Sequence, residues 1–317
     1  MYRVGIDLGG TNIVAGVVDE EYNIISKSEC KTSVPRPEAD ICDSMAEITL
    51  DAVKKAGLSF EDDIEAVGIG VPGAIDPKAG VVEYSANLFF HNWEIVKMMK
   101  ERLNGKKVLI ENDANAAAYG EYLAGSAKGA KNAVAITLGT GVGGGIIING
   151  KIYTGSNYAG AELGHMVIVK DGKECGCGRL GCWEAYASAT GLIDMTKEAI
   201  LKEKPEFSCM LSLVNGDLNK VEGKTAFDAM EQGDPIAKEV IDKYLSYLAA
   251  GLVNIINIFQ PDILCIGGGI SKQGETLLAP LRNIIEKERY TKHNNKQTVL
   301  CCASLENDAG IIGAAML

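Results

Sequence analysis

Residues 6–18 read IDLGGTNIVAGVV, and residues 136–148 read ITLGTGVGGGIII. In each stretch a β-branched run leads into a turn of Gly and Thr, and a second β-branched run follows. The matching positions keep one constant offset along the chain. We therefore interpret the two stretches as an internal duplication of a strand–turn–strand unit.

Strand and helix patterns alternate around both copies of this unit. Further strands are predicted at residues 64–71, 107–111, 133–138, 263–266 and 297–301. Helices are predicted at residues 39–56, from Asp113, at residues 188–201, 225–231, 235–259 and 275–288, and from Asn307. Such alternation is typical of an α/β fold. Because no linker or low-complexity stretch interrupts the pattern, only the duplication indicates a domain boundary, at roughly residues 113–133.

The composition narrows the kind of ligand. The chain has 317 residues, more than one hydrophobic core usually serves, so two domains are expected. Its formal net charge is −11, and no local basic patch interrupts the acidic composition. A surface of that charge repels nucleic acid and anionic lipid. A small-molecule ligand is the better interpretation.

The sequence also bears on location. No apolar run has the length of a transmembrane helix, because the longest candidate, Leu245–Phe259, is interrupted by Asn254 and Asn257. The first residues lack the apolar core of a signal peptide and have the pattern of a strand. We therefore expect a cytoplasmic protein that binds no membrane.

The first glycine turn, Asp7–Asn12, has the residues of a phosphate site. Its glycines let backbone N–H groups approach an anion closely, and the Asp7 carboxylate can hold a hydrated Mg²⁺ that the phosphate also contacts. The alternative is an ordinary hairpin turn with an exposed Asp. The second copy of the turn favours the phosphate site.

The second glycine turn, Gly139–Gly144, also fits the spacing G-x-G-x-x-G of dinucleotide-binding proteins. That fingerprint needs a helix after the glycines, whereas the β-branched run Ile146–Ile148 follows here, so a dehydrogenase is disfavoured. A third cluster, Gly267–Gly269, follows a predicted strand, and the three turns together could grip an adenine nucleotide. The alternative for the third cluster is close packing of a helix on a strand.

Asp113 stands between a predicted strand and an alanine-rich helix. One interpretation is a helix N-cap, because Asp is common at that position. The other is a general base for a substrate hydroxyl, which the neighbouring Asn112 favours in a chain expected to bind ATP. The residues alone leave both interpretations open.

Three of the nine Cys lie close together, at Cys175, Cys177 and Cys182, and His165 precedes them. One His and three Cys around tight glycine turns match a four-coordinate structural zinc site. Cys175 and Cys177 are closer together than in the usual C-x-x-C spacing. The alternative is a set of reduced thiols without metal.

Taken together, these motifs resemble those of the ROK family (repressor, open reading frame, kinase). The matching stretches run in family order from residue 7 to residue 271. They are DLGGTN at residues 7–12, GVPG at 70–73, ENDANAA at 111–117, LGTGVGGG at 138–145, AELGHM at 161–166, CGCGRLGCWEAYAS at 175–188 and IGGGIS at 266–271.

The resemblance implies an α/β protein with two actin-like ATPase (ribonuclease-H-like) domains around a central cleft. It implies an ATP-dependent hexose kinase similar to glucokinases, which transfers the γ-phosphate of ATP to the 6-hydroxyl of glucose. We expect a small domain at residues 1–118, to which helix 303–317 returns, and a large domain at residues 119–302 that carries the cysteine cluster. Catalytic Mg²⁺, structural Zn²⁺ and a homodimer are further implications.

The resemblance also gives roles to single residues, with Asp113 as the general base. The residues that it places on the sugar are Gly73, Asn87, Asn112, Asp113, Glu162, His165 and Glu184. It places the ATP phosphates near Gly10, Thr11, Thr140 and Gly141, beside Asp7, Gly9 and Asn12 of the first turn, and the adenosine near Gly268 and Gly269. The implied zinc ligands are His165, Cys175, Cys177 and Cys182.

The identity of the substrate stays open at this point. After Asn87 the chain reads LFFHNW at residues 88–93, which is bulkier than the typical Asn-Leu-Pro-Gly-Trp pattern, so the loop over the sugar is expected to differ. The alternative substrates are N-acetylmannosamine, N-acetylglucosamine and fructose. A sugar-sensing repressor without catalysis is disfavoured, because a phosphate turn that begins at Asp7 leaves no room before it for a helix-turn-helix.

Overall fold

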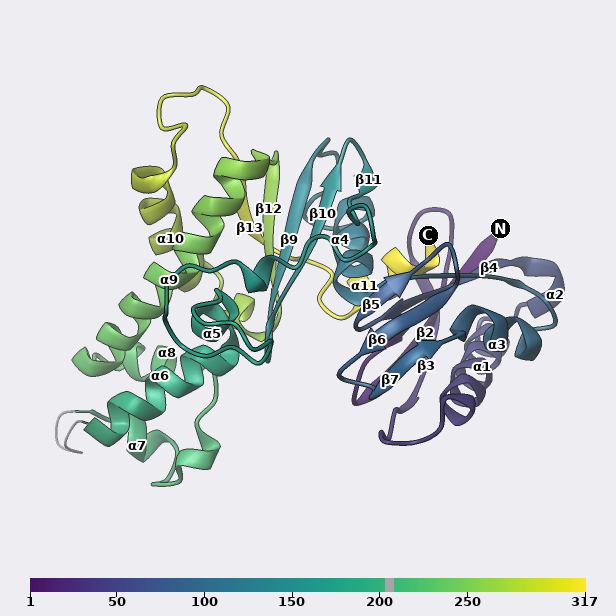
Figure 1. The fold of residues 1–317 in the computed structure, drawn as a ribbon, viewed down its shortest axis with the longest axis horizontal. Helices are drawn as coiled ribbons and strands as arrows, with labels where there is room; N and C mark the ends of the chain where they lie inside the picture. The colour runs from purple at the N-terminus through teal and green to yellow at the C-terminus, as the bar shows by residue number, and fades with distance from the viewer. Residues whose placement is uncertain (203–207) are drawn as a thin grey trace. The chain divides into compact units, whose positions relative to one another are not determined.

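The computed structural model describes residues 1–202 and 208–317. Its strands are β1 (Tyr2–Leu8), β2 (Asn12–Val18), β3 (Ile24–Lys31), β4 (Ile64–Val71), β5 (Ala74–Asp76), β6 (Val81–Ser85), β7 (Phe90–Trp93), β8 (Lys107–Asn112), β9 (Ala133–Leu138), β10 (Val142–Ile148), β11 (Lys151–Ile152), β12 (Ile263–Gly267) and β13 (Val299–Cys302). Its α-helices are α1 (Glu38–Lys55), α2 (Phe60–Asp63), α3 (Ile95–Arg102), α4 (Asp113–Leu123), α5 (Glu184–Ala187), α6 (Ala189–Lys202), α7 (Met210–Leu213), α8 (Thr225–Glu231), α9 (Pro235–Phe259), α10 (Glu275–Glu288) and α11 (Asp308–Ala315). The alternation confirms the predicted α/β class (Figure 1).

The duplicated units form the centres of two five-stranded sheets. The first sheet has the order β3-β2-β1-β4-β8 and the second the order β11-β10-β9-β12-β13. Both sheets are mixed, because β1 is antiparallel to β2 and parallel to β4, while β10 is antiparallel to β11 and β12 is parallel to β13. The two strand orders are equivalent when β1 is matched to β9, which confirms the predicted duplication.

Side-chain alternation gives the first sheet two different faces. Val4 and Ile6 belong to a large apolar cluster with Met45 of α1. On the other face, Gly5 and Gly68 meet α11, where an added Cβ at Gly68 would lie only 1.8 Å from the backbone oxygen of Ala314. The backbone of α11 therefore lies directly on the sheet. Figure 1 shows α1 and α3 on one side of this sheet and α4 and α11 on the other.

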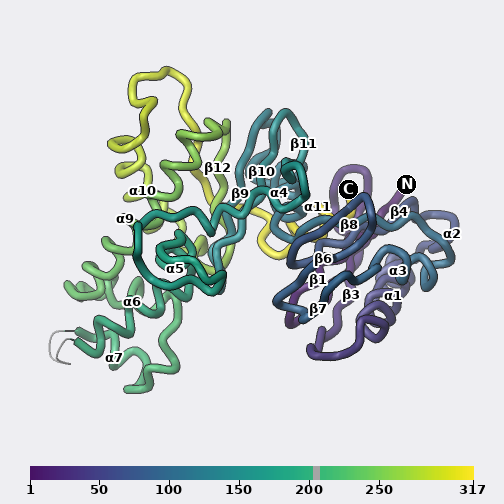
Figure 2. The backbone as a smooth tube through the Cα atoms, viewed as in Figure 1, coloured from purple at the N-terminus to yellow at the C-terminus, as the bar shows by residue number. Residues whose placement is uncertain are grey.

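The described chain divides into two compact units. Unit 1 comprises Met1–Ala135, Gly145–Ala161 and Ala303–Leu317, and unit 2 comprises Ile136–Gly144 and Glu162–Cys302. Both chain ends belong to unit 1 (Figure 2).

The predicted domain boundary at residues 118 and 119 falls inside α4, which belongs to unit 1 along its whole length. The reason is that α4 packs closely on α11, where an added Cβ at Gly120 would lie 2.1 Å from the oxygen of Ala309. Residues 203–207 of the predicted large domain lie outside the described residues. The assignment of domains at 1–118 and 119–302 stays a prediction.

Several elements of unit 1 escaped prediction. They include β3, α3, the short elements α2 and β11, and the small antiparallel sheet β5-β6-β7. The sequence of β3, IISKSECK, is mostly polar, and most of its side chains are half-buried or exposed. A strand of this kind lacks the apolar pattern by which strands are recognised.

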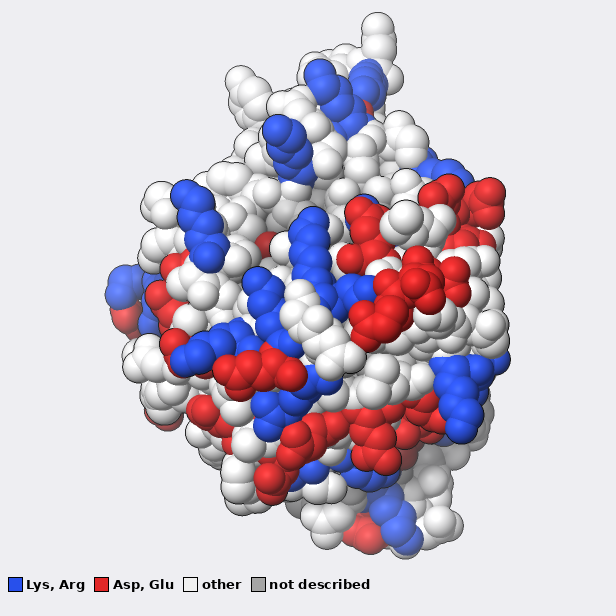
Figure 3. Space-filling model, turned by 90° about the vertical axis from the view of Figure 1, so that its right-hand side faces the viewer, with Lys and Arg blue, Asp and Glu red and all other residues white. Residues whose placement is uncertain are grey.

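Lys and Arg side chains are interspersed with Asp and Glu on the face of the molecule in Figure 3. Among the described residues, no helix combines the length and the apolar character needed to cross a lipid bilayer.

Candidate active site and metal centre

The first glycine turn connects β1 to β2 and is fixed by hydrogen bonds from its own ends and from Thr32. The Gly9 N–H donates to the Asn12 oxygen at 2.9 Å. The fully buried Thr32 donates its hydroxyl to the Gly9 oxygen at 2.6 Å and its N–H to the Thr11 oxygen at 2.9 Å. The backbone oxygens of Gly9, Thr11 and Asn12 thus all accept hydrogen bonds. Such a turn is a rigid platform for an anion.

Asp7 and Asp113 are two acidic groups in a poorly hydrated part of unit 1. Burial raises the pKa of Asp7 to about 6, with the negative charge of Asp113 as the second cause. Burial also raises the pKa of Asp113, although the Ala114 N–H donates to its Oδ1 at 2.9 Å and favours the ionised form. Acidic groups perturbed in this way are typical of cation sites and of proton acceptors.

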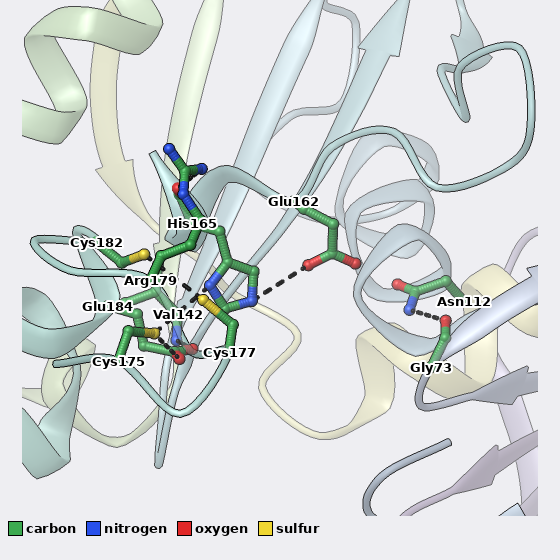
Figure 4. A network of polar contacts seen from close by, with 10 residues as sticks. All are labelled: Gly73, Asn112, Val142, Glu162, His165, Cys175, Cys177, Arg179, Cys182 and Glu184. Atoms are coloured by element: carbon green, nitrogen blue, oxygen red, sulfur yellow. Dashed lines mark hydrogen bonds and ion pairs between the residues drawn. The ribbon is translucent and has the colours of Figure 1, made fainter. Parts of the chain in front are cut away.

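The interpretation of Asp113 as a helix cap is wrong, because the cap of α4 is Asn112. The Oδ1 atom of Asn112 accepts hydrogen bonds from the N–H groups of Ala114 at 2.9 Å and Asn115 at 3.2 Å. Its Nδ2 donates to the Gly73 oxygen at 3.1 Å (Figure 4). Capping therefore does not explain the carboxylate at position 113.

Gly73 and Asn87 come together through the small sheet of unit 1. Gly73 has a φ of +127°, and an added Cβ there would lie 2.2 Å from the oxygen of Tyr84 in β6, so only glycine fits. Asn87 lies in the turn between β6 and β7, and its oxygen would be 3.6 Å from a Cβ added at Gly10. This turn thus lies against the first glycine turn. The bulky stretch after Asn87 begins in this turn, where Phe89 is exposed and has a φ of +64°, and continues as β7.

The predicted metal ligands come together in unit 2. The ligand atoms of His165, Cys175, Cys177 and Cys182 all lie within 4.8 Å of one another. The His165 Nδ1 is 3.7 Å from the Cys175 Sγ, and the Sγ atoms of Cys177 and Cys182 are also 3.7 Å apart. Zinc–sulfur bonds of about 2.3 Å in a tetrahedron separate two sulfur atoms by roughly 3.8 Å. The donor set and its spacing therefore fit a Cys₃His zinc site.

His165 can serve the metal and a second partner at once. It ends the short 3₁₀ turn Leu163–His165, which points its Nδ1 toward the cysteines. Its Nε2 lies 3.9 Å from the Glu162 Oε2 (Figure 4). A carboxylate next to the free nitrogen of a metal-bound histidine orients the ring. The ring of His165 thus has its Nδ1 next to the cysteines and its Nε2 next to a carboxylate.

Glu184 connects the cysteine cluster to the second glycine turn. Its Oε1 accepts a hydrogen bond from the Cys175 thiol at 3.4 Å, and its Oε2 accepts one from the Val142 N–H at 2.9 Å. Both carboxylate oxygens therefore have partners inside unit 2. Sequence reasoning placed Glu184 on the sugar alone and missed the contact with Val142.

In the third glycine cluster, Gly268 and Gly269 have different surroundings. Gly268 has a φ of +84°, and a Cβ there would lie 2.4 Å from the oxygen of Leu138 at the end of β9. At Gly268 the backbone therefore packs closely on the end of β9. No atom lies within 4 Å of a Cβ placed at Gly269, so this position has open space around it.

The predicted site residues are shared between the two units. Those in unit 1 are Asp7, Gly9, Gly10, Thr11, Asn12, Gly73, Asn87, Asn112 and Asp113. Those in unit 2 are Thr140, Gly141, Glu162, His165, Cys175, Cys177, Cys182, Glu184, Gly268 and Gly269. Within each unit, the contacts above bring residues from distant parts of the sequence together.

The raised pKa of Asp7 predicts a pH-dependent gain in stability for Asp7→Asn. The folded-state pKa of about 6 exceeds the ordinary value of 3.8, so ionisation destabilises the folded state as the pH rises between these values. In buffer without Mg²⁺ or nucleotide, the variant should be more stable than the wild type by roughly 2–3 kcal/mol at neutral pH. This difference should vanish below about pH 4. Urea unfolding of both proteins at neutral pH and below about pH 4 measures the difference in the free energy of unfolding. An equal difference at the two pH values would contradict the raised pKa of Asp7.

The geometry of the cysteine cluster predicts about one tightly bound zinc ion per chain. Elemental analysis of protein purified without chelator measures it. Cys177→Ser should lose the metal, since it removes one ligand from an exposed position. The control Cys30→Ser, outside the cluster, should keep it. Loss of zinc should also weaken sugar binding through His165, and metal-free wild-type protein would refute the site.

Comparison with known proteins agrees with these features. A sequence model of the ROK family matches residues 3–317. Glucokinases from Streptomyces coelicolor and from Thermotoga maritima are each 39% identical to this chain, over 99% of this chain and 96% of the relative.

A solved structure shows the same similarity in three dimensions. A ROK family glucokinase from Streptomyces griseus, in complex with glucose and AMPPNP, superposes with a TM-score of 0.83. It is 37% identical, and the match covers 100% of this chain and 98% of that chain. The two equivalent mixed sheets are therefore those of the actin-like ATPase fold. The chain belongs to the ROK family.

Proposed function

We propose that this protein is an ATP-dependent glucokinase that transfers the γ-phosphate of ATP to the 6-hydroxyl of glucose. The observation that carries the proposal is the half-buried carboxylate of Asp113 at the start of α4, where Asn112 already supplies the helix cap and desolvation raises the pKa of Asp113. A half-buried carboxylate with a raised pKa and no capping role has the chemistry of a proton acceptor. The glucokinases that are 39% identical over almost the whole chain support the same activity.

In the proposed reaction, Asp113 accepts the proton of the 6-hydroxyl. The new bond forms between that oxygen and the γ-phosphorus, while the bond from the γ-phosphorus to the bridging oxygen of ADP breaks. A hydroxyl is a weak nucleophile at neutral pH, and a general base accelerates such a step by roughly 10²–10⁴-fold. Burial raises the pKa of Asp113, which makes its carboxylate a stronger acceptor.

The glycine turns hold the ATP phosphates in this proposal. Gly10 and Thr11 of the first turn and Thr140 and Gly141 of the second offer backbone groups to them, and Gly268 and Gly269 lie near the adenosine. Asp7 is the residue that would hold Mg²⁺ through water. When bound, Mg²⁺ neutralises negative charge on the phosphates.

Both units contribute to sugar binding in the proposal. Unit 1 offers Gly73, Asn87 and Asn112 beside the base. Unit 2 offers Glu162, His165 and Glu184, and a bound zinc ion would orient the ring of His165. The homodimer and the cytoplasmic location implied by the family remain predictions, and light scattering tests the first of them.

The role of Asp113 predicts a selective loss of catalysis in Asp113→Asn. The amide keeps an acceptor for the Ala114 N–H, and Asn112 remains the cap, so the melting temperature should not fall. The turnover number kcat should drop by at least about 10²-fold, or roughly 3 kcal/mol, while glucose and ATP still bind.

Asp242→Asn, at an exposed position of α9, is the matched control and should be fully active. The rate of glucose 6-phosphate formation gives the turnover number of both variants. A folded Asp113→Asn enzyme with wild-type turnover would refute the base and direct attention to Asp7 and Glu162.

The proposed sugar contacts predict a preference for glucose over N-acetylmannosamine, N-acetylglucosamine and fructose. A site built to pair with hydroxyl groups rejects analogues that leave its polar groups unpaired. A coupled assay of ADP release across these four sugars gives kcat/KM for each. A higher value for any of the other three would refute glucose as the substrate, and no turnover with any sugar would refute the kinase.

A further inference from the structure

The second glycine turn is held by the chain segment that directly follows the cysteine cluster. The Glu184 Oε2 accepts a hydrogen bond from the Val142 N–H at 2.9 Å. The Ala189 N–H donates to the Gly139 oxygen at 2.9 Å, and the Thr190 hydroxyl donates to the Thr140 oxygen at 2.8 Å. Three hydrogen bonds from residues 184–190 thus fix a turn that lies more than forty positions earlier in the sequence.

This contact leaves no space between the two segments. A Cβ added at Gly141 would lie 2.3 Å from the Glu184 Oε2. The glycine at position 141 therefore permits the carboxylate to reach the backbone of Val142. The carboxylate in turn fixes the direction of the Val142 N–H.

The first glycine turn is held in a comparable way. The Thr32 hydroxyl donates to the Gly9 oxygen at 2.6 Å, as the Thr190 hydroxyl donates to the Thr140 oxygen in the second turn. Thr32 follows β3, whereas Thr190 lies in α6, so the two threonines come from different kinds of element. A threonine hydroxyl thus donates to a backbone oxygen in both copies of the turn.

The residues that hold the second turn are connected to the predicted metal ligands by a short, buried stretch. Glu184 is two positions after Cys182, and the intervening Trp183 is fully buried. The backbone N–H of Trp183 donates to the Met166 oxygen, next to His165, at 2.7 Å, and its ring N–H donates to the Tyr247 oxygen at 3.0 Å. Figure 4 shows Glu184 between Cys175 and Val142.

We infer that residues 184–190 form a brace that sets the conformation of the second glycine turn for nucleotide binding, with Glu184 and Thr190 as positioning residues. The brace also couples the cysteine cluster to the nucleotide, so the metal serves ATP binding as well as sugar binding. The inference rests on the proposed function, in which Thr140 and Gly141 contact the ATP phosphates.

Thr190→Val tests the brace without touching a predicted sugar contact. The change keeps the shape of the side chain and removes the hydroxyl donor. Loss of one such hydrogen bond should raise the Kd for ADP by roughly 5-fold, measured by calorimetry, with the KM for glucose unchanged. Ser246→Ala is the matched control, because its hydroxyl also donates to a backbone oxygen in unit 2, that of Lys243, and it should bind ADP as the wild type does.

A pair of variants at Glu184 tests the carboxylate contact. Glu184→Gln keeps an oxygen that can accept from the Val142 N–H, so its affinity for ADP should stay near that of the wild type. Glu184→Ala removes the acceptor and should weaken ADP binding by at least about 10-fold. Tight ADP binding by Glu184→Gln together with weak binding by Glu184→Ala would show that the hydrogen bond from the Val142 N–H supports nucleotide binding.

Removal of metal tests the coupling. Chelated wild-type protein should bind ADP more weakly, and added Zn²⁺ should restore the affinity. The brace is overturned if Thr190→Val and Glu184→Ala, folded by their melting curves, bind ADP as tightly as the wild type. That result would leave the kinase assignment intact, because turnover of glucose by the wild type is measured separately.

Discussion

Partial burial of the Asp7 and Asp113 carboxylates is the constraint on which the chemistry of unit 1 depends. Asp7 is at the end of β1, and a Cβ added at Gly310 of α11 would lie 3.3 Å from its carboxylate. Asp113 begins α4, and a Cβ added at Gly70 of β4 would lie 3.6 Å from its Cα. Glycines on neighbouring elements therefore let the backbone approach both residues, which shields the carboxylates in part from water.

That burial is possible because the last helix of the chain covers the first strand. Helix α11 lies on Gly5 and Gly68 of the sheet, and a Cβ at its Gly313 would lie 1.7 Å from the Ala116 oxygen of α4. A chain end more than 300 positions from Asp7 thus shapes its surroundings. In unit 2, the cysteine cluster plays a comparable structural role for the second glycine turn, through the segment that contains Glu184.

Much of this arrangement could be predicted from local patterns. The strand–turn–strand repeat predicts the two equivalent sheets, and the Cys and His spacing predicts a cluster that the fold brings together. Polar β3 gives no apolar alternation, so it escaped prediction. The choice between Asn112 and Asp113 as the cap depends on backbone geometry, and the contact of Thr190 with Thr140 depends on tertiary packing. Neither leaves a pattern in the sequence.

The interaction between Asp7 and Asp113 can be measured directly by a carbon-13 NMR titration of the Asp carboxyl groups in protein without Mg²⁺ or nucleotide. The account predicts that Asp7 titrates with a pKa of about 6 in the wild type and with a lower pKa in Asp113→Asn. The pKa in the variant should still exceed the ordinary 3.8, because the negative charge at position 113 is gone while burial, the larger cause, remains. A pKa for Asp7 near 3.8 in both proteins would contradict the account.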